Sequence, residues 1–550
     1  MSEQSVHEAE HVTIVGRRLF AVEPWCVSED ELDLDEIASS ESVFALSNGH
    51  IGLRGNLDEG EPHGVPGTYL NSFYELRPLE YGERGYGYSE SGQTVINVTD
   101  GKIFRLLVDD EPFDVRYGTL DAHRRRLDLR AGTLERTVEW HSPAGDGIRL
   151  RTTRLVSLTQ RAVAAIEYEV EPIDESLRIV VQSELVANED MPDLGPDPRT
   201  AAVLERPLVN EEHTASGTEA LMVHHTRQSG LRMAAGMRHE VEGPENTHLD
   251  IWSSEDVCRL TIATRLRPGE KLRIVKYLAY GWSSQRTRPA VHDQVVAALA
   301  GARLTGWHGL LAEQRSYLDR FWAGADVELE GDAEIQQAVR FGLFHILQSA
   351  ARAEQRPIPG KGLTGPGYDG HTFWDTETFV LPVLMFTTPE TAADPLVWRK
   401  LTMPIAEERA SELGLEGAAF PWRTIRGRET SGYWPASTAA FHINADIADA
   451  VVRYLDATQD EQFEREVAVD LLVGTARLFR SLGHHDRRGA FRIDGVTGPD
   501  EYTAIVDNNV YTNLMAQQNM RAAADIAARH RDLAEALGVT TEEMASWRDA

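Results

Sequence analysis

Leu272-Arg273-Ile274-Val275-Lys276-Tyr277-Leu278, which follows the turn Arg267-Pro268-Gly269-Glu270, lies where this 550-residue chain changes character. Its apolar and charged residues alternate with a period of two, as expected for a β-strand with one buried face. From residue 290 onward the apolar residues recur about every 3.6 positions, which is the period of an α-helix. The sequence therefore predicts strands in the first half of the chain and helices in the second.

Short alternating segments fill the first half, for example residues 166–170 and 177–181, and Gly, Pro, Asn and Asp separate them. This pattern predicts an amino-terminal β-sandwich over residues 1–282. The Ala-rich stretch that follows predicts a helical linker over residues 283–331. A chain of this length exceeds one hydrophobic core, so we expect a multidomain α+β protein.

The second half, residues 332–550, is predicted to be a helical catalytic domain. Asp332 is a candidate N-cap, followed by apolar residues on one helical face: Ile335, Ala338, Val339, Gly342 and Ile346. Near the end, Thr540 and Glu543 form the signature of a capping box. Because the chain stops soon after that helix start, we expect the helical domain to be incomplete.

Charge and cysteine content restrict the function. The formal net charge of -32 disfavours nucleic acid and anionic membranes as partners. Only Cys26 and Cys258 occur, which argues against a disulfide framework and fits a reducing compartment. Residues 1–8 are polar and acidic, unlike a secretory signal, and the longest apolar stretch, residues 379–386, is too short to span a bilayer. We therefore expect a cytoplasmic protein.

Gly365-Pro366-Gly367-Tyr368-Asp369-Gly370-His371-Thr372-Phe373-Trp374-Asp375-Thr376-Glu377 combines the residue types of a sugar site. Trp374 is a candidate platform for the sugar face, and Asp375 is a candidate acceptor for its hydroxyls. The alternative is a core tryptophan beside a helix-capping aspartate. The three glycines favour a loop whose backbone closely approaches another group.

Val496-Thr497-Gly498-Pro499-Asp500-Glu501-Tyr502 presents a second carboxylate on a Gly-Pro turn. Glu501 is the candidate general acid, because a glycosidic oxygen leaves readily only when a carboxylic acid protonates it. Asp500 could raise the pKa of Glu501 through like-charge proximity. The alternative is an exposed acidic turn.

Between these motifs, aromatic and charged residues alternate without helical or strand period, which predicts the wall of a second sugar site. The candidates are Trp422, Arg423, Glu429, Tyr433 and His442. His442 could equally be a hydrogen-bonded structural histidine. His484-His485-Asp486 lacks the spacing of a zinc site, so we expect a solvated turn and no metal.

Several stretches, in the same order, resemble glycoside hydrolase family 65, the inverting α-glucoside phosphorylases for trehalose, kojibiose and maltose. The stretches are residues 41–55, 361–365, 373–377, 442–446, 498–502 and 507–513. The resemblance implies an amino-terminal β-sandwich, a helical linker, an (α/α)6 barrel and a terminal β-sheet. It also implies a homodimer.

By the same resemblance Glu501 is the general acid, Trp374 and Asp375 bind the glucosyl unit, and residues 420–433 line the acceptor sugar. Inorganic phosphate, the co-substrate, attacks the anomeric carbon and gives β-glucose 1-phosphate with inversion; no other cofactor is implied. The family's phosphate-binding residues lie beyond the general acid, and nothing after Glu501 matches them.

Residues 420–425 and 431–439 look more like the trehalose and kojibiose enzymes than the maltose enzymes. We therefore expect phosphorolysis of trehalose or kojibiose. Two alternatives stay open: an α-glucoside hydrolase on the same fold, which would need a second carboxylate to activate water, and a sugar-binding protein without turnover.

Overall fold

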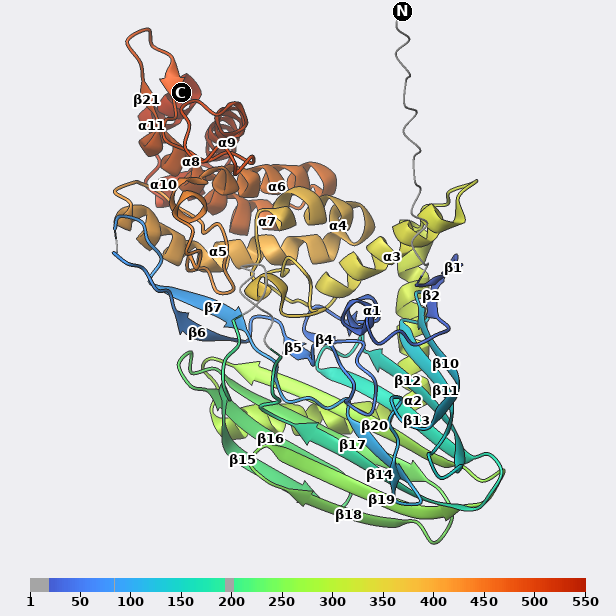
Figure 1. Ribbon diagram of the computed structural model, residues 1–550. Helices are drawn as coiled ribbons and strands as arrows, with labels where there is room; N and C mark the ends of the chain where they lie inside the picture. The colour runs from blue at the N-terminus through green and yellow to red at the C-terminus, as the bar shows by residue number, and fades with distance from the viewer. Residues whose placement is uncertain (1–18, 84, 193–201) are drawn as a thin grey trace, which may run out of the picture.

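The computed structural model describes residues 19–83, 85–192 and 202–550. A sheet-rich amino-terminal part and a helical carboxyl-terminal part lie against each other, with short strands and loops between them (Figure 1). The expectation that residues 1–8 are not a secretory signal lies outside the described residues.

Two antiparallel sheets form the amino-terminal part. The larger has ten strands, in the order β1 (Ala21–Glu23), β2 (Cys26–Glu29), β10 (Thr119–Asp128), β11 (Thr133–His141), β12 (Gly147–Val156), β13 (Val163–Pro172), β20 (Leu272–Ser283), β17 (Arg232–Glu242), β16 (Glu219–Thr226) and β15 (Leu208–Ser216). The smaller has five, in the order β18 (His248–Ser253), β19 (Val257–Leu266), β14 (Leu177–Val186), β8 (Phe104–Val108) and β9 (Glu111–Pro112).

The two sheets share one core, which makes this part a β-sandwich. Phe104 of the smaller sheet stacks on Tyr168 of the larger one, with ring centroids 4.7 Å apart. Ile179 and Leu260 from the smaller sheet and Trp140 from the larger are fully buried in the same cluster. The period-two pattern predicted this architecture, because alternate residues of each strand enter the space between the sheets.

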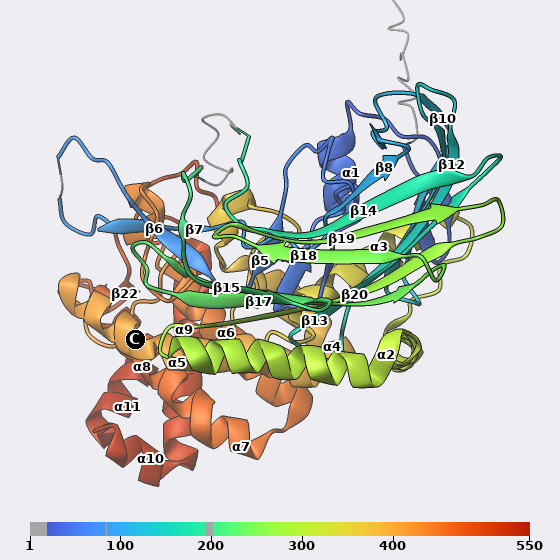
Figure 2. The ribbon, with the colours of Figure 1, turned by 90° about the horizontal axis from the view of Figure 1, so that it is seen from below.

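Helix α2 (Arg288–Ala325) covers the outer face of the larger sheet (Figure 2). Val295, Leu299 and Trp307 of α2 are buried against strands β13, β16, β17 and β20. Gly306 has φ of 69° and kinks the helix. By length and apolar composition alone, α2 is also the one described helix that could cross a membrane; here it forms a third layer on the sandwich.

Helix α3 (Ala333–Ala350) begins as predicted, since the Asp332 carboxylate accepts hydrogen bonds from the Glu334 and Ile335 amides. The predicted apolar face is wrong: Ile335 is 53% exposed. The buried face instead carries Gln337 and Arg340, which donate to backbone carbonyls of the first strands. Long polar side chains satisfy unpaired carbonyls there, a demand that the hydropathy pattern does not register.

Short elements connect the two parts. They are α1 (Ile37–Val43), the three-stranded sheet β3 (Leu46–Ser47), β4 (Ile51–Leu53) and β5 (Thr68–Leu70), the hairpin β6 (Tyr74–Pro78) and β7 (Ser91–Val95), and the 3-10 turn η1 (Gly367–Gly370). They place the glycine-rich loop against the amino-terminal sheets.

The helical part has a core of its own. Its elements are the π-turn η2 (Thr376–Val380), α4 (Leu381–Thr387), α5 (Pro389–Glu412), the π-turn η3 (Pro435–Ala439), α6 (His442–Thr458), α7 (Glu461–Phe463), the π-turn η4 (Glu464–Ala468), α8 (Val469–Leu482), the strands β21 (His484–His485) and β22 (Phe491–Arg492), α9 (Val510–Arg529), α10 (Arg531–Ala536) and α11 (Thr541–Asp549). The predicted cap of α11 is confirmed, because Thr540 accepts from the Glu543 amide.

Candidate active site

Four rings from separate segments meet at the centre of the candidate site. The Trp374 centroid lies 6.5 Å from that of Trp422, 5.0 Å from His442 and 6.2 Å from Tyr511. His442 lies nearly perpendicular to the other three rings. We call these four residues the aromatic cluster. The structure thus brings together Trp374, Trp422 and His442, which the sequence singled out separately.

Tyr511 and Asp446 were not among the predicted site residues. The Tyr511 hydroxyl donates to Asp446 Oδ1 over 2.7 Å, and His442 Nδ1 lies 2.7 Å from Asp446 Oδ2. A usable signal was present: His442 and Asp446 are four residues apart, so a helix places both on one face. Tyr511 gave no local signal, because only the tertiary packing of α9 brings it to the cluster.

Trp374 of this cluster is followed in sequence by Asp375. Trp374 is half-buried and Asp375 is exposed. Asp375 stands at the N-cap of η2, but its side chain makes no capping hydrogen bond. The capping alternative therefore does not explain this carboxylate, which is free to meet a ligand beside the indole ring.

Arg399 and Glu377 form a buried ion pair. Arg399 Nε of α5 donates to Glu377 Oε1 over 2.7 Å, and both side chains are 1% exposed. Burial raises the pKa of Glu377, against the lowering effect of Arg399. Glu377 closes the sequence motif that begins at Gly365, so the pair ties this segment to α5.

Asp369, on the turn η1, joins the β6–β7 hairpin and the backbone at residue 202 to the site. Its carboxylate accepts hydrogen bonds from Arg77 Nη2, Thr94 Oγ1, the Ala202 amide and Arg423 Nη2, at 2.7 to 3.1 Å. Burial opposes ionisation, but the surrounding donors and cations prevail and hold the pKa of Asp369 below its usual value. Arg423, which was predicted to contact sugar, braces this turn.

Arg423 also donates from Nε to His371 Nδ1 over 2.7 Å. His371 is fully buried, and its Nε2 lies 2.6 Å from the Gln93 carbonyl oxygen on β7. Burial, with Arg423 nearby, lowers the pKa of His371 to about 3, so the imidazole is neutral. Guanidinium and imidazole together fix the loop that precedes Trp374.

Gly370 of this loop serves the same contact. Gly370 has φ of 72°, and a Cβ there would lie 2.6 Å from the Val95 Cβ. Tyr368 and Asp369 also adopt positive φ, at 54° and 56°. Such backbone is uncommon for residues other than glycine and persists only where surrounding bonds impose it. The close approach suggested by the glycines is therefore, at Gly370, to the β6–β7 hairpin.

Asp369→Asn should destabilise the protein by about 1.5–3 kcal/mol, because hydrogen bonds to a charged group are lost. The native pKa of Asp369 is lowered, so its contribution is full at neutral pH and is lost as the pH falls through that lowered value. Thermal unfolding at several pH values should show the deficit shrinking in acid. A deficit that grows in acid would contradict this assignment.

Glu429 and Tyr433, the remaining residues predicted to line the acceptor sugar, differ in exposure: the first is buried and the second is exposed. Glu429 is buried and accepts from the amides of Trp422, Thr430 and Ser431 at 2.6 to 2.9 Å, so it shapes the loop around Trp422. Burial raises its pKa. Tyr433 is 53% exposed on the same loop and can still reach a ligand.

Glu501 lies on a loop that precedes α9. The bridge between Val496 and Val506 closes this loop, and the Thr497 amide donates to the Ala439 carbonyl at η3. Glu501 is exposed, and its side chain makes no hydrogen bond or ion pair with the residues that the structure describes. Asp500 is also exposed, and it accepts hydrogen bonds from the Tyr502 amide and the Thr503 hydroxyl of the same loop. The geometry suits both the general acid and the exposed acidic turn.

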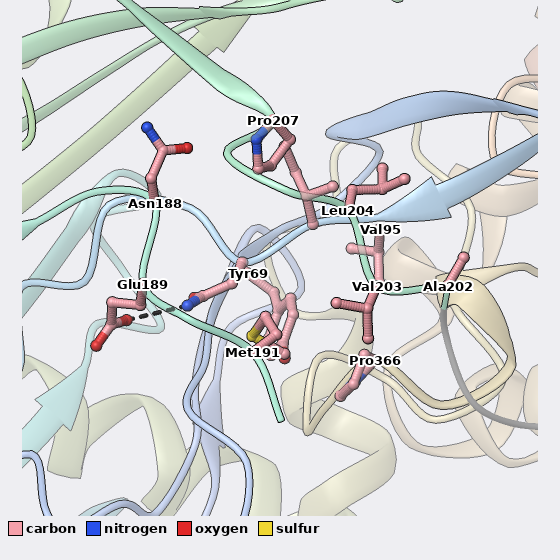
Figure 3. A pocket seen from close by; sticks show the side chains of 12 residues that line it. Tyr69, Val95, Asn188, Glu189, Met191, Ala202, Val203, Leu204, Pro207 and Pro366 are labelled. Carbon is pink, nitrogen blue, oxygen red and sulfur yellow. Dashed lines mark hydrogen bonds between the residues drawn. The ribbon is translucent and has the colours of Figure 1, made fainter. Parts of the chain in front are cut away.

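A small cavity lies beside the glycine-rich loop, between β5, β7, the β14–β15 connection and Pro366 (Figure 3). Its volume of 30 Å³ suits about one water molecule and is too small for a sugar ring. Glu189 lines it and accepts from Asn97 Nδ2. Burial, together with Asp100, raises the pKa of Glu189 to about 7.

Neither the predicted turn nor the thiols form a metal site in the described part of the chain, where no cluster of three His, Cys, Asp or Glu side chains could hold an ion. His484 and His485 pair with β22 in a short hairpin. Burial raises the pKa of Cys26 and of Cys258 to about 12, so both thiols stay protonated and unreactive.

Comparison with known proteins extends over nearly the whole chain. Residues 27–321 match the family model "Glycosyl hydrolase family 65, N-terminal domain", and residues 340–550 match "Glycosyl hydrolase family 65 central catalytic domain". An uncharacterized glycosyl hydrolase of Mycobacterium tuberculosis is 65% identical over 96% of this chain and 68% of its own length.

Relatives named for an activity are more distant. An α,α-trehalose phosphorylase of Thermoanaerobacter brockii is 35% identical, over 97% of this chain and 71% of its own length. A human-microbiome structure assigned provisionally as a kojibiose phosphorylase is 24% identical and covers 97% of this chain and 70% of its own. Its TM-score of 0.89 shows the same fold. On the two family matches and these relatives, the chain belongs to glycoside hydrolase family 65.

Proposed function

We propose that this protein cleaves an α-linked glucose disaccharide, trehalose or kojibiose in preference to maltose, by inverting phosphorolysis. The products are β-glucose 1-phosphate and glucose. One observation carries the proposal: the half-buried Trp374, with exposed Asp375 beside it, is held by rings from three other segments, one of which directly follows the Glu501 loop.

In this mechanism the glucosyl ring lies on Trp374 and its hydroxyls bind Asp375. Glu501 donates its proton to the glycosidic oxygen as the bond from that oxygen to the anomeric carbon breaks. A phosphate oxygen forms the new bond from the opposite face, which inverts the configuration. The Glu501 carboxylate regains its proton from solvent. Phosphate is already an anion, so no second carboxylate is needed to activate it.

Other parts of the proposal follow from the family. We propose that residues 1–282, 283–331 and 332–550 are the sandwich, the linker and the helical catalytic domain, and that the helices belong to an (α/α)6 barrel. Trp422 and Tyr433 would line the acceptor sugar. Phosphate would be the co-substrate with no further cofactor, and the protein would be a cytoplasmic homodimer that binds neither nucleic acid nor membrane.

The presence of phosphate should decide the reaction. Incubation of the protein with trehalose, kojibiose, nigerose or maltose should release glucose only when phosphate is present, with one glucose 1-phosphate formed for each glucose. Polarimetry or NMR should identify the β-anomer as the first product. Release without phosphate would instead show a hydrolase, and binding of a disaccharide without turnover would show a sugar-binding protein.

A further inference from the structure

Asp446 joins two helices beneath the aromatic cluster. On α6 it lies one turn after His442, and its other carboxylate oxygen accepts from Tyr511 on α9. His442 is 0% exposed and Asp446 1% exposed, so neither is hydrated. Burial raises the pKa of Tyr511, and the charge of Asp446 raises it further, so the phenol keeps its proton and donates.

The proton positions follow from the chemistry of these groups. An ionised carboxylate can only accept hydrogen bonds, so the contact with Asp446 requires a proton on His442 Nδ1. In the neutral imidazole, Nε2 is then an acceptor. Nε2 is buried and has no partner among the described residues. Leaving a buried polar atom unpaired costs about 1–3 kcal/mol, so this nitrogen is suited to a donor that arrives with a ligand.

Tyr511 also links the cluster to the Glu501 loop. It is the second residue of α9, whose N-cap is Asn509, the last residue of that loop. Its ring lies 6.2 Å from Trp374 and 5.7 Å from His442. The same side chain therefore contacts the proposed sugar platform and ties the start of α9, through Asp446, to α6.

We infer that Asp446 is a positioning residue for the sugar site. It holds His442 as the Nδ1–H tautomer, so that Nε2 accepts a hydrogen bond from a hydroxyl of the glucosyl unit. Through Tyr511 it also holds the start of α9, and with it the Glu501 loop, against Trp374. The expected effect on turnover rests on the proposed function, whereas the assignment of the His442 tautomer does not depend on it.

The test compares Asp446→Asn with Asp449→Asn. Asp449 lies on the same helix and accepts from Gln518 of α9, so its replacement also weakens an α6–α9 contact but leaves His442 untouched. In Asp446→Asn the amide can donate to Nδ1, which moves the imidazole proton to Nε2. The 15N chemical shifts of the His442 ring should report this change of tautomer in 15N-histidine-labelled protein. The His442 signals are assigned as those that are missing from the His442→Gln variant. Asp449→Asn should keep the native tautomer.

The kinetic result expected for Asp446→Asn is a rise of at least about tenfold in KM for the disaccharide, with KM for phosphate unchanged. A carboxylate-to-amide change beside the catalytic histidine of serine proteases lowers kcat about 10⁴-fold, but His442 carries no proton in this reaction, so the effect is smaller. Asp449→Asn should behave as wild type. Tyr511→Phe, which keeps the ring, should retain the tautomer and show a smaller change.

An Asp446→Asn protein with the native tautomer, or with wild-type KM values, would overturn the inference. If Asp446→Asn does not fold, two other results would overturn the inference. One is wild-type protein in which His442 is protonated at Nε2, and the other is a Tyr511→Phe variant that behaves as wild type. If wild-type protein turns over no disaccharide, the proposed function fails, and the tautomer measurement still decides the role of Asp446.

Discussion

Replacing Glu501 by Gln should lower kcat for disaccharide phosphorolysis by about 10²–10⁴-fold, the usual contribution of a general acid. The amide cannot protonate the glycosidic oxygen, so the sugar must leave as an alkoxide. Glu501 is exposed and its side chain makes no hydrogen bond or ion pair with the described residues, so its replacement should not disturb the fold. Disaccharide binding, measured by quenching of tryptophan fluorescence, should remain.

Substrate chemistry provides the sharpest control. α-Glucosyl fluoride has a leaving group that departs without a proton, so Glu501→Gln should use it with phosphate nearly as well as wild type does. Glu535→Gln, an exposed carboxylate on α10, should have no effect on either substrate. Equal losses on the fluoride and on the disaccharide would show that Glu501 has a role other than proton donation.

Arg399→Met should cause the largest loss of stability, about 3–5 kcal/mol, because it leaves the buried Glu377 carboxylate without its partner. Both side chains are 1% exposed, so water cannot replace the lost interaction. Differential scanning calorimetry or urea unfolding of the whole protein should show this loss of stability.

The double variant Glu377→Met/Arg399→Met is the matched control. Without the charge, two apolar side chains of similar size should restore much of the lost stability. In Arg399→Met the pKa of Glu377 is raised by burial with no cation to oppose it, so the deficit should be small in acid and grow as the pH rises through that value. A double variant as unstable as the single one would refute the ion-pair explanation.

The sequence predicted the layers of the fold where one periodicity dominates. Alternation at residues 166–170 became part of β13, because strand and core share the period of two. The face of α3 was predicted wrongly, because Gln337 and Arg340 are buried for their hydrogen bonds to carbonyls that lie more than 300 residues away in sequence. Hydropathy measures transfer from water and does not include such partners.

The site was predictable to the extent that its chemistry is local. Trp374, Trp422 and His442 stand out by residue type and do meet. Arg423 and Glu429 stand out equally, yet Arg423 bonds to the loop before Trp374 and Glu429 to the backbone of its own loop, because a charged residue in a loop can serve a ligand or the protein itself. Only the tertiary structure distinguishes these two uses. It also shows that Tyr511 belongs to the aromatic cluster.

The four hydrogen bonds at Asp369 have a consequence for recombining relatives of this family. A chimaera that takes its sandwich from one protein and its helices from another would pair Asp369 with Arg77, Thr94 and the backbone at residue 202 of a different parent. Exchanging substrate loops between family members should therefore succeed when the β6–β7 hairpin and the β14–β15 connection travel with the loop before Trp374. Specificity in this architecture is inherited as a set of segments from both halves of the chain.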